Sequence, residues 1–163
     1  MKILGIDPGL ATTGFGIIEK IGSKFTCVEY GTIDTPAGLE LSSRLELISK
    51  QLNDLFLKYD INCVAMESLF FNTNTKTAML VAQARGVLLL TSRQHNKQIT
   101  AYTPPQVKTG VCGYGRAEKK QVQYMVQKLL NLDKLPKPDD AADGLALAIC
   151  HAHNSKLSYM SKK

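Results

Sequence analysis

Long hydrophobic runs are missing from this 163-residue chain. No segment approaches the roughly 20 consecutive apolar residues that a membrane-spanning helix requires. At the N-terminus, Asp7 interrupts the apolar stretch of residues 1–9 after only a few positions, which disfavours both a signal peptide and a membrane anchor. We therefore expect a cytoplasmic protein that has no membrane partner.

Closely spaced cysteines are also missing. The sequence CHAH at residues 150–153 suggests a zinc site, but on a helix His151 and His153 would point about 200° apart, and four ligands cannot be assembled locally. The spacing of the cysteines fits reduced thiols in the cytoplasm better than a disulfide framework. They form no C-x-x-C pair and lie far apart: Cys27, Cys63, Cys112 and Cys150.

Internal repeats, low-complexity tracts and an interdomain linker are absent from the sequence as well. The length is sufficient for one domain with a real hydrophobic core and short for two. We therefore expect a single domain over residues 1–155, followed by a flexible basic tail over residues 156–163.

Basic residues, by contrast, are in excess and unevenly distributed. The formal net charge is +6, and ten of the 20 lysines and arginines fall within residues 104–163. Such a distribution suits a polyanionic partner, although many basic proteins bind none. The sequence therefore favours nucleic acid as a partner without establishing it.

The apolar and turn patterns predict an α/β domain. Strands are expected at residues 2–7, 13–21, 24–34, 61–67 and 98–104, and helices at residues 39–59, 76–94, 117–130 and from 139 onward. The basic segment 107–116, which contains glycines, is expected to be a loop. The first three strands can pair antiparallel, whereas the strand–helix–strand units require parallel crossovers. A mixed five-stranded sheet flanked by helices follows, and this element order resembles that of the ribonuclease H-like fold.

The predicted helix at residues 76–94 is apolar around nearly its whole circumference. Such a helix should be covered on more than one side. We expect one side to face the core, and we take the other side as a candidate subunit interface.

Four acidic residues lie at the ends of three predicted elements. Asp140 and Asp143 are neighbours on one face of the last helix, since they are three residues apart. Alone, they are explained by the preference of acids for the first helical turn, with Asp139 as a cap. However, Asp7 and Glu67 each end an apolar strand, and sites in α/β sheets are built at the carboxyl ends of strands. The four acids are therefore candidates for one site.

Four converging carboxylates repel one another unless a cation neutralises them, and hard divalent cations prefer oxygen ligands. Two Mg²⁺ ions about 4 Å apart would allow one to activate water and the other to stabilise the leaving oxygen of a phosphodiester. We therefore predict two Mg²⁺ ions per active site, for which Mn²⁺ could substitute.

Several motifs together resemble the RuvC family of bacterial Holliday junction resolvases over essentially the whole chain. They occur in the family's order and approximate spacing: GIDPGLATTGFG, ESLFF, QARG, PPQVKTGVCGYGRAEKKQVQ and DAADGLALAICHAH. The resemblance implies a ribonuclease H-like fold and a homodimer that nicks two opposing strands of a four-way junction symmetrically. It also implies Mg²⁺ held by Asp7, Glu67, Asp140 and Asp143, products with 5′-phosphate and 3′-hydroxyl ends, and a branch-migration motor, RuvA–RuvB, as partner.

The resemblance further points to DNA-binding residues. Phe70 matches the family aromatic that stacks on an unpaired base, worth about 1–3 kcal/mol per base, although a phenylalanine here could equally belong to the core. Lys108 and Lys119 match family lysines near the scissile phosphate, although each could be an ordinary solvated lysine. Arg116 and Lys120 are further candidates for phosphate contacts because they lie in the same basic segment.

Three other functions compete with this interpretation. A sugar-kinase-like or actin-like phosphotransferase also begins with a strand and a D-x-G turn, but it needs two copies of the fold to close over a nucleotide. A module that binds junctions without cutting them would not need the acid set. A small ribonuclease H-like resolvase of another family would share the acids but lack the GYGRAEKK and DAADGLALA motifs.

Overall fold

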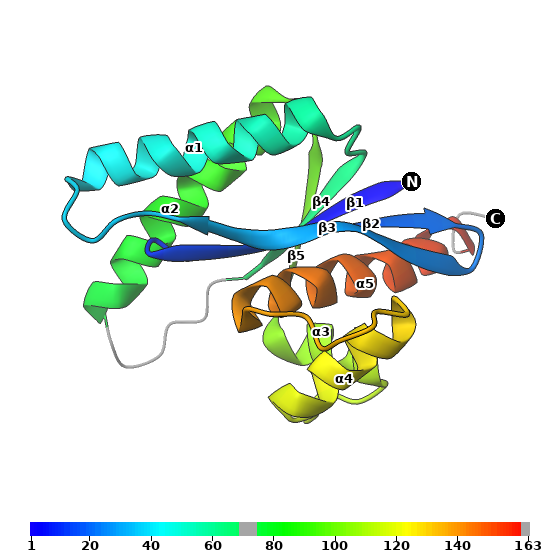
Figure 1. Cartoon of the computed structure of the whole chain (residues 1–163). Coiled ribbons are helices and arrows are strands. Elements are labelled where there is room, and N and C mark those ends of the chain that lie inside the picture. The colour runs from blue at the N-terminus through cyan, green and yellow to red at the C-terminus, as the bar shows by residue number, and fades with distance from the viewer. Residues whose placement is uncertain (69–74, 161–163) are drawn as a thin grey trace.

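Five strands form one mixed sheet in the order β3-β2-β1-β4-β5. The structure is a computed structural model, and it describes residues 1–68 and 75–160 (Figure 1). The first three strands pair antiparallel, while β1 with β4 and β4 with β5 pair parallel. The predicted mixed sheet is therefore confirmed. Its strands are β1 (Lys2–Asp7), β2 (Thr12–Ile21), β3 (Lys24–Asp34), β4 (Cys63–Glu67) and β5 (Gln98–Tyr102).

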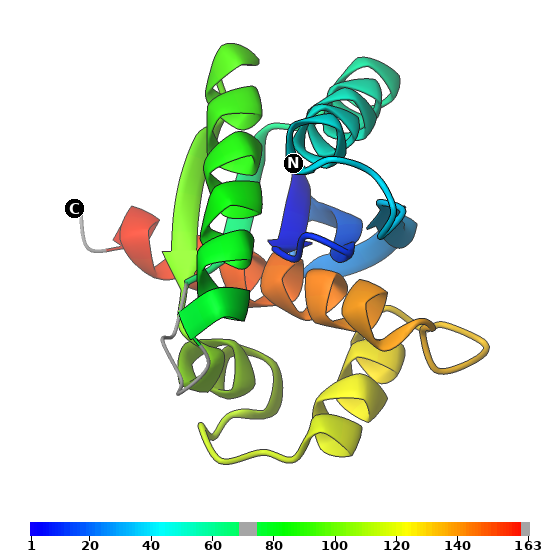
Figure 2. The same ribbon diagram turned by 90° about the vertical axis from the view of Figure 1, so that its left-hand side faces the viewer.

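Helices cover both faces of the sheet. Helices α1 and α2 lie on one face, α5 lies on the other, and α3 and α4 form a further layer beyond α5 (Figures 1 and 2). Within the described ranges, no helix is both long enough and apolar enough to cross a membrane. The helices are α1 (Leu41–Lys58), α2 (Thr75–Gln94), α3 (Pro104–Cys112), α4 (Lys119–Leu129) and α5 (Asp139–Met160).

The core consists of two apolar clusters, one on each face of the sheet. Successive strand residues point to opposite faces. Thus Leu4 and Val64 are buried in the cluster that contains residues of α1 and α2, whereas Ile3 and Ala65 are buried in the cluster that contains residues of α3, α4 and α5. Near-continuous apolar strands such as β1 are therefore explained by burial on both faces.

Glycines allow α5 to lie against the backbone of β1 and β2. A Cβ atom at Gly14 would overlap the carbonyl group of Asp140, and one at Gly5 would overlap the carbonyl oxygen of Gly144. This close approach sets the N-terminal turns of α5 beside the end of β1. The packing of α5 therefore determines where Asp140 and Asp143 lie.

Substitution of Gly14 by Ala is expected to destabilise the fold. The added methyl group must push α5 away from β2, and overpacking of this kind costs about 1–3 kcal/mol. Urea unfolding of the purified variant measures the loss. Gly38→Ala is the matched control, because a Cβ at Gly38 meets nothing within 4 Å. Equal stability of the two variants would contradict the close approach of α5.

The main error of the sequence prediction concerns α3. We expected a strand to continue to residue 104 and a loop to follow at 107–116, but Pro104–Cys112 is helical. Thr103 and Gln106 form a reciprocal capping box, and the two prolines occupy the first helical positions, where proline is favoured. The prolines thus begin a helix as well as ending a strand.

Two boundaries at α5 also differ from the prediction. Asp139 is the first residue of the helix rather than the residue that caps it, since the backbone N–H of Ala142 already bonds to the Pro138 carbonyl. At the other end α5 continues to Met160, whereas we expected a flexible tail from residue 156. Residues 156–160 are therefore helical, and residues 161–163 lie outside the described part of the chain.

Candidate active site

The topology of the sheet brings Asp7 and Glu67 together. Asp7 is the last residue of β1 and Glu67 the last residue of β4, and these strands are parallel neighbours that pair Ile6 with Met66. Asp143, in the first turns of α5, lines the same cleft of about 270 Å³. Three of the four predicted acids therefore face one cleft, whose other walls are Pro104, Val107, Lys108, Lys119, Val122, Ala146 and Leu147.

The carboxyls of Asp7 and Glu67 share a hydrogen bond. Burial, together with the charges of Glu67, Asp143 and Asp140 and the hydrogen bond with Glu67, raises the pKa of Asp7 to about 8. Burial also raises the pKa of Glu67, whereas the hydrogen bond with Asp7 lowers it. At neutral pH the pair therefore holds a proton, because two buried carboxylates in contact disfavour each other's ionisation unless a cation is present.

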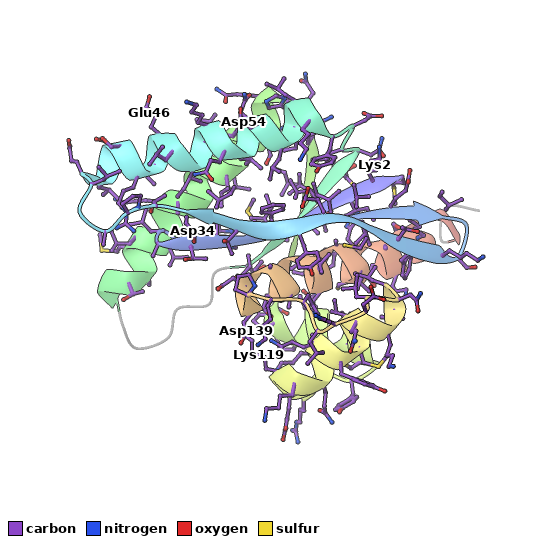
Figure 3. All side chains as sticks on the ribbon, in the orientation of Figure 1. Lys2, Asp34, Glu46, Asp54, Lys119 and Asp139 are labelled. Atoms are coloured by element: carbon purple, nitrogen blue, oxygen red, sulfur yellow. The ribbon has the colours of Figure 1, made fainter. Side chains whose placement is uncertain are left out.

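Lys119 supplies positive charge at the edge of the cleft. Its Nζ lies 3.1 Å from Oδ2 of Asp143 and 3.7 Å from Oδ2 of Asp139. Burial raises the pKa of Asp143, and the hydrogen bond from Lys119 offsets part of this rise. The Lys119 side chain is 54% exposed, so the ion pair contributes little to stability. Its ammonium group is accessible to an anionic substrate. Figure 3 shows Lys119 and Asp139 together at the start of α5.

Asp140 lies beside the cleft rather than in its lining. It borders a neighbouring hollow of about 430 Å³ together with Arg44 and the turn at residues 9–12. Its negative charge nevertheless reaches Asp7, whose pKa it raises. The structure thus brings all four predicted acids into one neighbourhood, with three in the cleft and the fourth at its side.

The four acids lie near one another, but their side chains are not arranged as metal ligands. Among the residues that the structure describes, no group of three or more histidine, cysteine, aspartate or glutamate side chains could hold a metal ion as it stands. The donors are all carboxylate oxygens, which suit hard divalent cations such as Mg²⁺. A bound cation would replace the proton between Asp7 and Glu67 and remove the repulsion that raises their pKa values. The chemistry of the donor set therefore fits a divalent cation.

The comparisons with known proteins identify the family. A model of the family "Crossover junction endodeoxyribonuclease RuvC" matches residues 3–151. The chain belongs to this family. The RuvC of Alkaliphilus oremlandii is 55% identical over 162 residues, which cover 99% of both chains. That of Clostridioides difficile is 57% identical over 157 residues, covering 96% of this chain and 93% of the relative.

Solved structures of the RuvC family share the fold as well. Thermus thermophilus RuvC in complex with a Holliday junction substrate superposes with a TM-score of 0.93 at 30% identity, covering 97% of this chain and 96% of the other. A second Thermus thermophilus RuvC structure gives a TM-score of 0.89 with 97% of both chains covered. The predicted ribonuclease H-like fold is therefore confirmed.

The predicted DNA-binding residues are dispersed around the cleft. Lys108 and Lys119 line it directly. Arg116 is exposed between α3 and α4, and Lys120 is exposed on α4, where it lines a separate groove. Phe70 lies outside the described residues, so its stacking role stays a prediction.

Sequence reasoning did not single out Arg85. Its Nε donates to the backbone carbonyl of Glu67 at 3.1 Å and thereby ties α2 to the end of β4. The QARG motif, one of those that carry the resemblance, was the signal that contained it, but the motif alone does not say what the arginine contacts. Arg85 helps to position Glu67 through the backbone.

Proposed function

We propose that this chain is a crossover junction endodeoxyribonuclease that resolves four-way DNA junctions in recombination and repair. The observation that carries the proposal is the acid cleft at the ends of β1 and β4 in a chain that the RuvC family model covers from residue 3 to residue 151. The superposition on a RuvC bound to a Holliday junction supports the same substrate. A nucleotide phosphotransferase is disfavoured, because such enzymes need two copies of the fold.

Asp7, Glu67, Asp140 and Asp143 would hold two Mg²⁺ ions. The support is chemical: the donors are all oxygens, and burial, followed by the neighbouring acidic charges, raises the pKa of Asp7. When bound, the divalent cations would activate a water molecule and stabilise the oxygen that leaves phosphorus. Mn²⁺ could substitute because it also accepts oxygen ligands.

The other residues that line the cleft would attract the phosphate and exclude water. Lys108 and Lys119 line the cleft, where their charges would attract a DNA phosphate and balance the charge that develops on it. Val107, Val122 and Leu147 form apolar walls that exclude bulk water from one side of the reacting phosphate. Hydrolysis with water as nucleophile and the 3′-oxygen as leaving group gives 5′-phosphate and 3′-hydroxyl ends.

Lys119→Ala is expected to slow cleavage about 10- to 100-fold at saturating protein, because a positive charge beside the phosphate is lost. Folding stability should change by less than about 1 kcal/mol, since the Lys119 ion pair is solvent-exposed. Single-turnover kinetics on a four-way junction measures the first effect and urea unfolding the second. Lys134→Ala, at an exposed lysine in the linker before α5, is the control. Equal cleavage rates for both variants would refute the assigned role of Lys119.

Two symmetric nicks require two active sites, and we propose that a homodimer supplies them through α2. On this helix Met79 is 64% exposed and Leu90 is 60% exposed. Together with Gly86 these residues lie on one face, because 79, 86 and 90 are spaced by near-integral helical turns. A Cβ at Gly86 would meet nothing within 4 Å, so a second helix could approach closely there. Figure 2 shows this helix at the front of the molecule.

Membership of the family supports a proposal about the cellular setting. We propose that the chain works in the cytoplasm, together with a RuvA–RuvB branch-migration motor that moves the junction. The four cysteines are free thiols, which agrees with a reducing compartment.

The proposed function is tested by incubating the protein and Mg²⁺ with labelled four-way junctions and, separately, with linear duplexes of the same sequence. The junction should be cut into nicked duplexes by paired, opposed nicks, while the linear duplex stays intact. Tight junction binding without cutting, under conditions where Mg²⁺ is present, would favour a binding module and contradict the nuclease.

A further inference from the structure

Helices α3 and α4 carry a strongly one-signed charge. Residues 101–132 contain one acidic residue, Glu118, which is the N-cap residue of α4. The same segment contains five basic residues: Lys108, Arg116, Lys119, Lys120 and Lys128. Since these helices form the layer farthest from α1 (Figure 1), this end of the molecule presents positive charge to solvent and suits a polyanion.

An apolar groove of about 370 Å³ lies between these two helices. Tyr114 and Tyr124 are 48% and 54% exposed, although tyrosine would gain stability from burial. The hydroxyl of Tyr114 donates to Oε1 of Gln121 at 2.8 Å, and Nζ of Lys128 lies 5.3 Å from the centroid of the Tyr124 ring. The groove is lined by Cys112, Tyr114, Lys120, Gln121, Tyr124 and Met125.

Exposed aromatic faces beside cations are what proteins use to bind nucleic-acid strands. Lysines contact successive phosphates, and aromatic rings stack on bases or sugars without sequence preference. A protein partner with an apolar helix would also find aromatic surface here. However, the excess of basic residues around the groove matches DNA phosphates, and DNA is already the substrate of the adjacent cleft.

The groove is separate from the acid cleft but adjoins it along both helices. On α4, Lys119 lines the cleft and the next residue, Lys120, lines the groove. On α3, Lys108 lines the cleft and Cys112, one turn later, lines the groove. A strand that leaves the cleft along α3 and α4 would therefore lead toward the groove.

We propose that the groove between α3 and α4 binds a strand of the DNA arm that leaves the acid cleft. Lys120 and Lys128 contact its phosphates, and Tyr114 and Tyr124 contact its sugars and bases. This contact extends the DNA footprint beyond the junction centre and strengthens binding of junctions with long arms. The proposal rests on the proposed junction substrate, because the arm enters the groove from the cleft.

The test compares the double variant Lys120→Ala/Tyr124→Ala with the unaltered chain. Each protein is bound to two kinds of junction, one with arms long enough to reach the groove and one with arms too short to reach it. Without divalent metal, the dissociation constant for long arms should rise about tenfold or more, and the constant for short arms should not change. The slope of log affinity against log salt should also fall by about 0.9 for the lost lysine. Lys50→Ala, exposed on α1 on the opposite face of the sheet, should change neither quantity.

An unchanged affinity and salt slope for long arms would overturn the proposal and leave the groove to a protein partner. Cys112 provides a second test that does not depend on how the double variant folds. Its free thiol should exchange with an activated mixed disulfide tethered to the DNA arm, forming a protein–DNA disulfide and releasing the small leaving thiol, and Cys112→Ser should not. Absence of this crosslink would likewise overturn the proposal. Cutting of short-armed junctions by the unaltered chain reports the proposed function separately, since those junctions do not reach the groove.

Discussion

Asp7→Asn is expected to slow junction cleavage severely and, at the same time, to make the metal-free protein more stable. Most active-site substitutions leave stability unchanged or lower it. Here the wild-type carboxyl is buried among acids and its pKa is raised to about 8. The amide of Asn carries no charge and can still donate a hydrogen bond to Glu67, so the repulsion disappears while the packing remains.

The size and the pH dependence of this gain follow from linkage. A carboxyl whose folded pKa lies above its unfolded value of 3.8 destabilises the fold increasingly as pH rises from about 4 to about 8. At pH 7 the penalty is at most about 4 kcal/mol, and we expect about half of this because Glu67 shares the proton. The melting temperature should therefore rise by roughly 4–8 °C at pH 7, with a smaller gain toward pH 4.

Thermal unfolding of both proteins in a chelator, at several pH values, measures the effect. Asp54→Asn is the control, because Asp54 is exposed on α1, far from the cleft (Figure 3). Addition of Mg²⁺ should stabilise the wild type and not Asp7→Asn, whose cleavage rate should be about a thousandfold lower. An Asp7→Asn protein less stable than the wild type without metal would show that the acids do not repel one another as described.

Leu90→Glu is expected to separate the proposed dimer into monomers. Leu90 is 60% exposed in the single chain, but in a dimer through α2 it would be covered, and a buried unpaired carboxylate is strongly unfavourable. The dimer dissociation constant should rise at least about a hundredfold. On a four-way junction, paired nicks should give way to single nicks, because the second active site is no longer recruited.

Analytical ultracentrifugation over a range of concentrations measures the dissociation constant. Leu57→Glu is the matched control: Leu57 is 73% exposed on α1, a helix that is not part of the proposed interface. If Leu90→Glu stays dimeric while Leu57→Glu dissociates, the interface lies on another face of the molecule.

The sequence predicted the acids of this site because their positions follow from topology. Asp7 and Glu67 end apolar strands, and parallel neighbouring strands must end at the same edge of the sheet. The spacing of Asp140 and Asp143 sets both on one face of α5. Which side chains line the cleft could not be predicted to the same extent, because this depends on how the helices pack on the sheet. Asp140 lies beside the cleft rather than in it, although it is less than one helical turn away from Asp143 along α5.

The region from Thr103 to Cys112 was less predictable. Its proline pair ends β5 and begins α3, and only the first role was inferred. Gly110 also argued against a helix, yet a Cβ there would lie 2.7 Å from Sγ of Cys150, so the glycine is explained by the packing of α3 on α5. Contacts such as Arg85 with the Glu67 carbonyl join elements distant in sequence, and no local pattern reveals them.

The most direct test of the account is the cleavage of a four-way junction by the wild-type chain as a function of Mg²⁺, with the product ends mapped. We expect no cleavage in a chelator, and with Mg²⁺ paired nicks on two opposing strands that leave 5′-phosphate and 3′-hydroxyl ends. A junction that is bound but remains intact at every Mg²⁺ and Mn²⁺ concentration, or that is cut equally well in the chelator, would contradict the assignment of the acid cleft as a metal-dependent nuclease centre.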